Sequence, residues 1–109
     1  MNSTYTDEET GAKAEITEYS LGGYFQLTNI FVPRKYRKRG HGSRLLREVV
    51  QDADKMGYTI YCEITVADEK FGLGYDELRQ WIIRHGFKYW KGKYRRLPIR
   101  RNEDVPDSI

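Results

Sequence analysis

A helical repeat of apolar residues between strand-like segments does most to restrict the folds open to this chain. Within residues 41–56, the apolar positions fall on one helical face: Leu45, Leu46, Val49, Val50 and Ala53. Gly57 follows them directly, and glycine is a common residue just past a helix end. The segments on both sides are rich in aromatic and β-branched residues, which favour strands. A helix between strands predicts a sheet with helices packed on it.

The other segments complete a mixed order of elements. They predict, in order, strands over residues 13–20, 24–32 and 58–66, a helix over residues 75–85 and a β-rich segment over residues 87–97. Lys91 and Gly92 can turn the last segment into a hairpin. The order β-β-α-β-α-β(β) predicts an α/β or α+β fold with a mixed, mostly antiparallel, twisted sheet.

The length and composition favour one small domain over residues 1–109. We expect the polar ends, residues 1–11 and 102–109, to be flexible tails. No run approaches the roughly 18 apolar residues of a membrane span, and the first residues lack the basic and apolar regions of a secretory signal. Cys62 is the single cysteine. It excludes an internal disulfide and a cysteine-based metal site, and it fits a reducing cytoplasmic setting.

Basic residues gather in two windows. Of the 19 Lys and Arg residues, seven lie in residues 34–47 and seven in residues 88–101. Two such clusters suggest a polyanionic partner, either a phosphorylated cofactor or a nucleic acid, and a solvated surface is the alternative. In the second window, aromatic residues interleave with the basic ones. They fit a stacking platform for a single-stranded nucleic acid, but a protected edge hairpin with its aromatics inside is the favoured interpretation.

The first basic window leads through Gly40 and Gly42 into the helix over residues 41–56. A helix N-terminus exposes unpaired N–H groups and a partial positive charge. Glycines let a backbone approach a phosphate closely, because they have no Cβ. The Gly-Lys-Ser/Thr end of a P-loop and the third glycine of a dinucleotide fingerprint are both missing. The segment therefore predicts an anion site of another class.

Residues 37–42, Arg-Lys-Arg-Gly-His-Gly, resemble the Arg/Gln-X-X-Gly-X-Gly/Ala motif of GNAT-type N-acetyltransferases. The strand that ends at Val32 and the helix that follows the motif have the same context as in that family. Gly86 and Phe87 are similar to the usual end of the last family helix. The resemblance covers about residues 12–97. It implies a truncated GNAT-like fold, of the kind seen in small phage-encoded members, with acetyl-coenzyme A (acetyl-CoA) as cofactor.

The resemblance also implies which residues hold the cofactor. The backbone of Ile30, Phe31 and Val32 would pair with the pantetheine arm as a further strand would. The sheet would splay there, between the strands over residues 24–32 and 58–66. Backbone N–H groups of the next segment would hold the pyrophosphate: Arg37, Lys38, Arg39, Gly40, His41, Gly42 and Ser43.

Two positions that often carry catalytic groups in this family hold Gln26 and Ile82 here, and neither side chain can do that chemistry. Acyl transfer needs a neutral attacking amine and a stabilised or protonated thiolate. Glu63, on the third expected strand, is our candidate base, and a surface carboxylate is its alternative. Tyr75, at the start of the last helix, is the candidate group near the thiol, and an aromatic packed on the loop is its alternative. Trp81, on the apolar face of that helix, is expected in the core.

These features favour an N-acetyltransferase that moves an acetyl group from acetyl-CoA to an amine. The chain is too short for much of the wall that family members build on the acceptor side. We therefore expect a macromolecular amine, such as a protein Lys or N-terminus, more than a small metabolite. A homodimer could supply the missing wall. A coenzyme A-binding protein without catalysis is the second hypothesis, and a nucleic-acid-binding module is the third.

Overall fold

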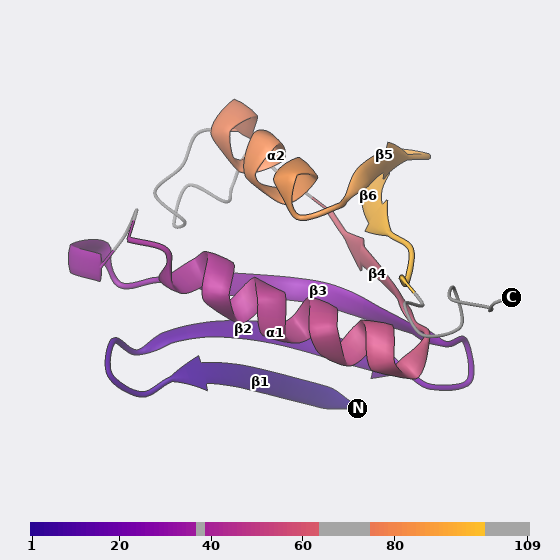
Figure 1. Cartoon of the computed structure of the whole chain (residues 1–109), viewed down its shortest axis with the longest axis horizontal. Coiled ribbons are helices and arrows are strands. Elements are labelled where there is room, and N and C mark those ends of the chain that lie inside the picture. Colours follow the sequence, from indigo (N-terminus) through magenta and orange to yellow (C-terminus); the bar gives the residue numbers. More distant parts are fainter. Residues whose placement is uncertain (37–38, 64–74, 100–109) are drawn as a thin grey trace, which may run out of the picture.

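The fold is a six-stranded sheet with both helices on one of its faces (Figure 1). The computed structural model describes residues 1–36, 39–63 and 75–99. The elements are β1 (Asn2–Asp7), β2 (Ala12–Tyr19), β3 (Tyr24–Phe31), the 3-10 helix η1 (Arg34–Tyr36), α1 (His41–Met56), β4 (Thr59–Cys62), α2 (Tyr75–Arg84), β5 (Lys88–Trp90) and β6 (Lys93–Arg96). Neither of the two described α-helices is long and apolar enough to cross a membrane.

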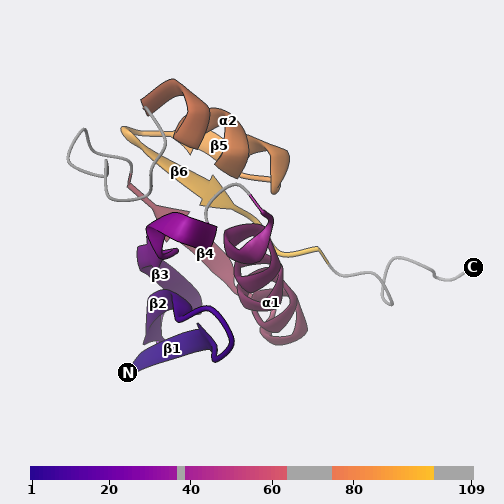
Figure 2. The same cartoon turned by 90° about the vertical axis from the view of Figure 1, so that its left-hand side faces the viewer.

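The sheet is mixed and mostly antiparallel, as predicted. Its strand order is β1-β2-β3-β4-β6-β5, and only β3 and β4 run parallel. Parallel neighbours need a long crossover, and α1 provides it between β3 and β4. Figure 2 shows α1 alongside β1 to β4, with α2 toward the β5–β6 end.

The core lies between the helices and this one face of the sheet. Alternating residues of β2, β3 and β4 point into it, as the period of two in a strand requires. The largest fully buried side chains are Phe87, Leu45, Leu46, Ile60, Ile82 and Val49. No described helix covers the opposite face of the sheet, which we call the open face.

The expectation of a flexible tail over residues 1–11 is wrong. Residues Asn2–Asp7 form an edge strand in full register with β2. The Tyr5 hydroxyl donates a hydrogen bond of 2.7 Å to Asp52 on α1, and burial together with this carboxylate raises the pKa of Tyr5. The polar composition was misleading because β1 is held by backbone pairing with β2 and by the contact of Tyr5 with α1. The second expected tail, residues 102–109, lies outside the described residues.

The predicted hairpin is present and turns at Lys91 and Gly92. Both have positive φ, 48° and 85°, which is the backbone of a type I′ turn. The expectation that its aromatics lie inside holds for Tyr94, which is buried, and fails for Tyr89, which is 68% exposed. Tyr89 lies opposite Tyr94 on the same face of the hairpin, but β5 is the edge strand of the sheet, so fewer neighbours cover Tyr89.

Candidate functional site

The first part of the site is the point where β3 leaves β4. The two strands pair from Tyr24 opposite Thr59 to Leu27 opposite Cys62. β3 continues to Phe31, still paired with β2 on its other side. Within the described residues, no strand pairs with the β4-facing edge of β3 beyond Leu27. This edge includes Ile30 and Phe31, two of the residues expected to hold an extended ligand.

A β-bulge marks the same point. Glu15 of β2 lies opposite Asn29, whereas Ile16 lies opposite Leu27, so Thr28 is an extra residue in β3. A bulge bends its strand and increases the local twist. The Thr28 hydroxyl donates a hydrogen bond of 3.1 Å to the Glu15 carbonyl, which holds the bulge on the β2 side. The bend therefore begins where β3 stops pairing with β4.

The second part is the N-terminus of α1, which begins just after this edge. Its N-cap residue, Gly40, has a φ of 88°, and no described side chain caps the helix. The first turn contains no acidic residue. A Cβ at Gly40 would meet nothing within 4 Å, so the approach to this backbone is open. Arg39 is exposed beside it, whereas Arg37 and Lys38 lie outside the described residues. Unpaired N–H groups at such a helix end suit an anion.

Gly42 differs from Gly40 in its surroundings. A Cβ at Gly42 would lie 3.4 Å from Val32 Cγ2, 3.6 Å from Trp81 Cζ2 and 3.9 Å from Ile30 Cγ2. A methyl group would therefore fit here in ordinary van der Waals contact, whereas a larger side chain would meet β3 and α2. The prediction that both glycines lie against a phosphate stays a prediction, and their surroundings differ.

Trp81 connects α2 to the N-terminus of α1. Its indole N–H donates a hydrogen bond of 2.7 Å to Ser43 Oγ. The ring is half-buried and packs against the core, as expected, but its polar edge faces the candidate anion site. Because the Ser43 oxygen accepts this bond, the hydroxyl proton can still be donated to a ligand oxygen. Sequence periodicity indicated the packing of Trp81 but not this hydrogen bond.

Comparison with known proteins assigns these parts to a family. The model of the Acetyltransferase (GNAT) family matches residues 7–71, more than half of the chain. This chain belongs to the GNAT acetyltransferase family. The match spans the edge of β3 and the glycine segment described above. A search of curated protein sequences finds no match.

Solved structures show the same fold over a longer stretch. The chain is similar to the anti-CRISPR protein AcrVA5, with 16% identity and a TM-score of 0.69, covering 86% of this chain and 95% of that one. It is also similar to an acetyltransferase from Bacillus cereus ATCC 14579, with 18% identity and a TM-score of 0.61, covering 87% of this chain and 67% of that one. The predicted truncated GNAT-like fold is confirmed.

Within this GNAT fold, Asp7 is a residue that the sequence analysis missed. Its buried carboxylate lies 2.6 Å from Arg44 Nη2 and 3.4 Å from His41 Nδ1, both in the first turn of α1. The Thr10 hydroxyl, the backbone N–H of Glu9 and these two basic groups hold the pKa of Asp7 below its usual range. The His41 side chain therefore faces Asp7, whereas its backbone belongs to the glycine segment. No local signal marks the ion pair of Asp7, because its two basic partners lie more than 30 residues away.

The expected catalytic residues occupy different surroundings. Glu63 is exposed and follows Cys62, the last β4 residue that pairs with β3. If the alternation of β4 continued one residue past its end at Cys62, Glu63 would share the open face with Tyr61. Tyr75 begins α2, but its side chain lies outside the described part of the structure. Ile82 is 1% exposed in the core and Gln26 lies opposite Tyr61 in the sheet, so these two positions supply no titratable group.

Proposed function

We propose that this chain is an acetyl-CoA-dependent N-acetyltransferase that acts on an amine of a protein. The observation that carries the proposal is the free edge of β3 beside the uncapped N-terminus of α1. A strand edge offers N–H and C=O groups to an extended amide chain, and a helix N-terminus offers N–H groups to phosphates. Coenzyme A has both parts: its pantetheine arm is an extended amide chain that would lie along the strand edge, and its pyrophosphate would lie at the helix N-terminus.

The residues present fit that cosubstrate. The backbone of Ile30, Phe31 and Val32 would hold the pantetheine arm, and the segment from Arg37 to Ser43 would hold the pyrophosphate. Support comes from the open approach to Gly40, the absence of acidic residues in the first turn and the exposed Arg39. Bound acetyl-CoA would supply a thioester, whose acetyl group is the one transferred.

Glu63 is the residue we propose as the base. A protonated amine has no lone pair for attack, so a proton must be removed before or during formation of the C–N bond. Glu63, directly or through a water, would take this proton at the mouth of the divergence between β3 and β4. The C–S bond breaks as the C–N bond forms, and the thiolate then needs a proton. Tyr75 remains the candidate donor for this second step.

A protein acceptor is favoured by the open face. Glu63 is exposed just after β4, and no described helix covers the open face of the sheet, so a large partner can reach it. The similarity to AcrVA5, an anti-CRISPR protein whose chain is matched over 95% of its length, supports a macromolecular acceptor. A second copy of this chain as an additional wall remains a prediction, as does a cytoplasmic location.

Three measurements test the proposal. Saturating acetyl-CoA should raise the melting temperature by roughly 10–20 °C, the effect of a ligand at about 100 times its Kd on a domain of this size. Incubation with acetyl-CoA and lysine-containing peptides should then give acetylated peptides in a mass spectrum. In Glu63→Gln, kcat should fall by about 10²- to 10⁴-fold while KM for acetyl-CoA is retained. Glu8→Gln, on an exposed turn, is the matched control.

The outcomes separate the alternatives. A melting shift without acetylation of any peptide would support a coenzyme A-binding protein without catalysis, an alternative favoured by the buried Ile82. No melting shift at millimolar acetyl-CoA would refute both functions and would favour the nucleic-acid-binding hypothesis. Equal activity of Glu63→Gln and Glu8→Gln would refute Glu63 as the base.

A further inference from the structure

The open face carries a row of aromatic rings that the proposed transfer reaction does not use. Tyr19 at the end of β2 stacks on Tyr24 of β3, with ring centroids 4.8 Å apart. Tyr24 meets Tyr61 of β4 edge to face at 5.2 Å, and Tyr61 meets Trp90 of β5 at 5.9 Å. The row therefore crosses the sheet from β2 to its far edge. Tyr61 lies two residues before Glu63, which directly follows β4.

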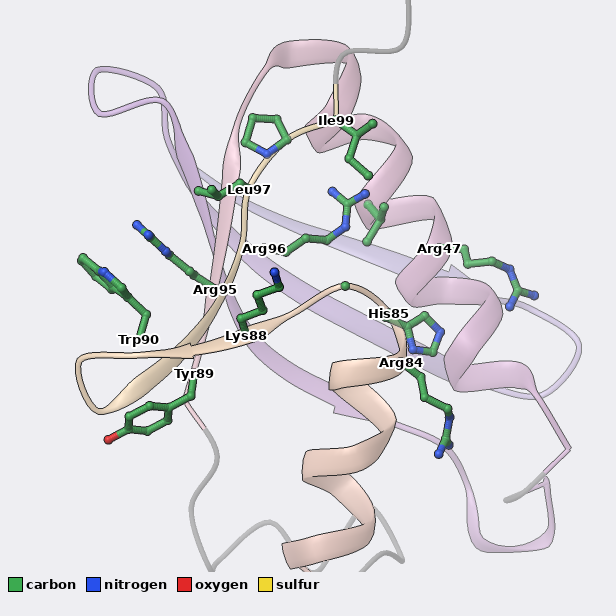
Figure 3. A pocket seen from close by; sticks show the side chains of 13 residues that line it. Arg47, Arg84, His85, Lys88, Tyr89, Trp90, Arg95, Arg96, Leu97 and Ile99 are labelled. Atoms are coloured by element: carbon green, nitrogen blue, oxygen red, sulfur yellow. The ribbon is translucent and has the colours of Figure 1, made fainter. Parts of the chain in front are cut away.

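Cations cover the rings at the β5–β6 end of this row. Lys93 Nζ lies 5.4 Å from the Tyr61 ring centroid. The Arg95 guanidinium lies 4.3 Å from the Trp90 centroid, and Lys91 Nζ lies 5.0 Å from it. Figure 3 shows Arg95 and Trp90 on one side of the hairpin and Arg96 on the other side, toward α1. We call Tyr61, Trp90, Lys91, Lys93 and Arg95 the cationic row.

The positive charge of this row is not neutralised within the described structure. Residues 86–99 contain five basic residues and no acidic one. Arg96 is paired, because it makes two hydrogen bonds to Asp54 on the helix side. None of Lys91, Lys93 and Arg95 has a carboxylate partner among the described residues. Three cations that lie against aromatic rings are thus at least partly exposed, and none has a carboxylate partner in the part of the chain that the structure describes.

The geometry favours an acidic polypeptide over nucleobases. Base stacking needs a free aromatic face, but cations already lie over the Tyr61 and Trp90 rings. Contact with a ring also limits the motion of a long Lys or Arg side chain, so less conformational entropy is lost when a carboxylate binds. The row is therefore better suited to fixed carboxylates than to bases.

We propose that the cationic row docks an acidic segment of the acceptor protein, next to the lysine that is acetylated. The inference rests on the proposed function, and it specifies the acceptor of the same site. Carboxylates near a lysine raise the pKa of its amine, which makes the neutral form rarer. When Lys93 and Arg95 pair with those carboxylates, the two cations offset the increase in the pKa of the amine that the carboxylates cause. Docking thus positions the lysine near Glu63 and also favours its deprotonation.

The test uses two blocked peptides, each with one lysine. In the first, Asp and Glu flank the lysine, and in the second, Asn and Gln replace them. The proteins are the full chain, the double variant Lys93→Gln with Arg95→Gln, and a control double variant, Arg47→Gln with Lys55→Gln. The control removes the same charge from exposed positions on α1. Fluorescence anisotropy measures binding, mass spectrometry measures acetylation, and melting curves verify that both variants are folded.

We expect the acidic peptide to bind the full chain about tenfold more tightly than its neutral counterpart. The Lys93 and Arg95 variant should lose about five- to tenfold in affinity, as expected for two partly exposed ion pairs, and the control should lose less than about twofold. The difference in affinity between the acidic and the neutral peptide should shrink as the salt concentration is raised. Acidic-peptide binding without acetylation would uphold the docking surface and refute the proposed function.

Three results would overturn the docking proposal. The first is equal affinity for the acidic and the neutral peptide, or measurable acetylation of both peptides at the same rate. The second is an equal loss in the control variant, which would move the binding to the groove between α1 and the hairpin shown in Figure 3, where Arg47 lies. The third is tighter binding of a thymidine oligonucleotide than of the acidic peptide, lost in the Lys93 and Arg95 variant, which would assign the row to nucleic acid.

Discussion

Alanine at Gly40 and alanine at Gly42 should change the stability of this protein in opposite directions. Gly40 has a φ of 88°, and a Cβ there would touch nothing within 4 Å. The cost of Gly40→Ala is therefore backbone strain alone, about 1–2 kcal/mol for an L-residue in the left-handed region. For a chain of this size, that strain lowers the melting temperature by roughly 5–15 °C.

Gly42 lies inside the first turn of α1 with helical backbone. An added methyl would lie 3.4–3.9 Å from Val32, Trp81 and Ile30, which is ordinary van der Waals contact. Gly42→Ala also reduces the conformational entropy of the unfolded chain, which stabilises the folded state by up to about 1 kcal/mol. The melting temperature should rise by a few degrees, up to about 8 °C.

The effect on acetyl-CoA should separate the two glycines as well. Gly40→Ala distorts the loop that would hold the pyrophosphate, so the Kd for acetyl-CoA should rise about tenfold or more, a loss of roughly 1.4 kcal/mol. Gly42→Ala should leave this Kd nearly unchanged, in line with the alanine that the family motif accepts at this position. Calorimetric titration measures both values.

Gly92 provides the matched control. Its φ is 85°, and a Cβ there would also meet nothing within 4 Å, but it lies in the hairpin turn away from α1. Gly92→Ala should therefore lose stability like Gly40→Ala and bind acetyl-CoA like the unchanged protein. Melting shifts of the same sign for Gly40→Ala and Gly42→Ala would refute the structural reasoning. An equal loss of affinity in Gly92→Ala would refute the assignment of Gly40 to the cofactor.

Three further predictions concern other contacts. Asp7→Asn should lower the free energy of unfolding above about pH 4. The difference from the unchanged protein should narrow as the pH falls below 3.8, because a carboxyl whose pKa is lowered by folding stabilises the folded state only when it is ionised. Denaturant melts at pH 7, 5 and 3 measure this difference. Asp54→Ala should lose about 3 kcal/mol in a urea melt, because it leaves the 6% exposed Arg96 guanidinium without its carboxylate. In Trp90→Phe the remaining tryptophan is Trp81, beside Ser43, so acetyl-CoA should change the fluorescence of this variant. In Trp81→Phe the remaining tryptophan is Trp90, and acetyl-CoA should leave its fluorescence unchanged. A change in Trp81→Phe and none in Trp90→Phe would contradict the placement of the site.

Local patterns were sufficient for most of the elements. The apolar period predicted α1 with its observed ends, and the Lys91–Gly92 pair predicted the hairpin turn. Both signals act over a few residues, so they do not depend on the rest of the fold. The tail prediction for residues 1–11 failed because β1 is stabilised by pairing with β2 and by the Tyr5 contact to α1. Polarity alone does not report such pairing.

In the candidate site too, the sequence indicated some parts and missed others. The glycine segment and the strand before it were visible in the sequence, because spacing within a short motif carries the signal. Asp7 and the Trp81 hydrogen bond were not, since their partners are distant in the chain; the Trp81–Ser43 bond spans 38 residues. Gly40 and Gly42 look equivalent in the motif, and only the backbone angle and the neighbours of each one separate them.

The sequence by itself determined the family motif and the described elements other than β1, with their order, because periodicity, turn residues and short spacings are properties of neighbouring residues. The tertiary structure decided which distant side chains meet at the N-terminus of α1, where β3 departs from β4, and which sheet face stays open. It also brought rings from four strands into one row, with the hairpin cations over two of them. These features depend on strand register and helix packing, which bring together residues that no local pattern connects.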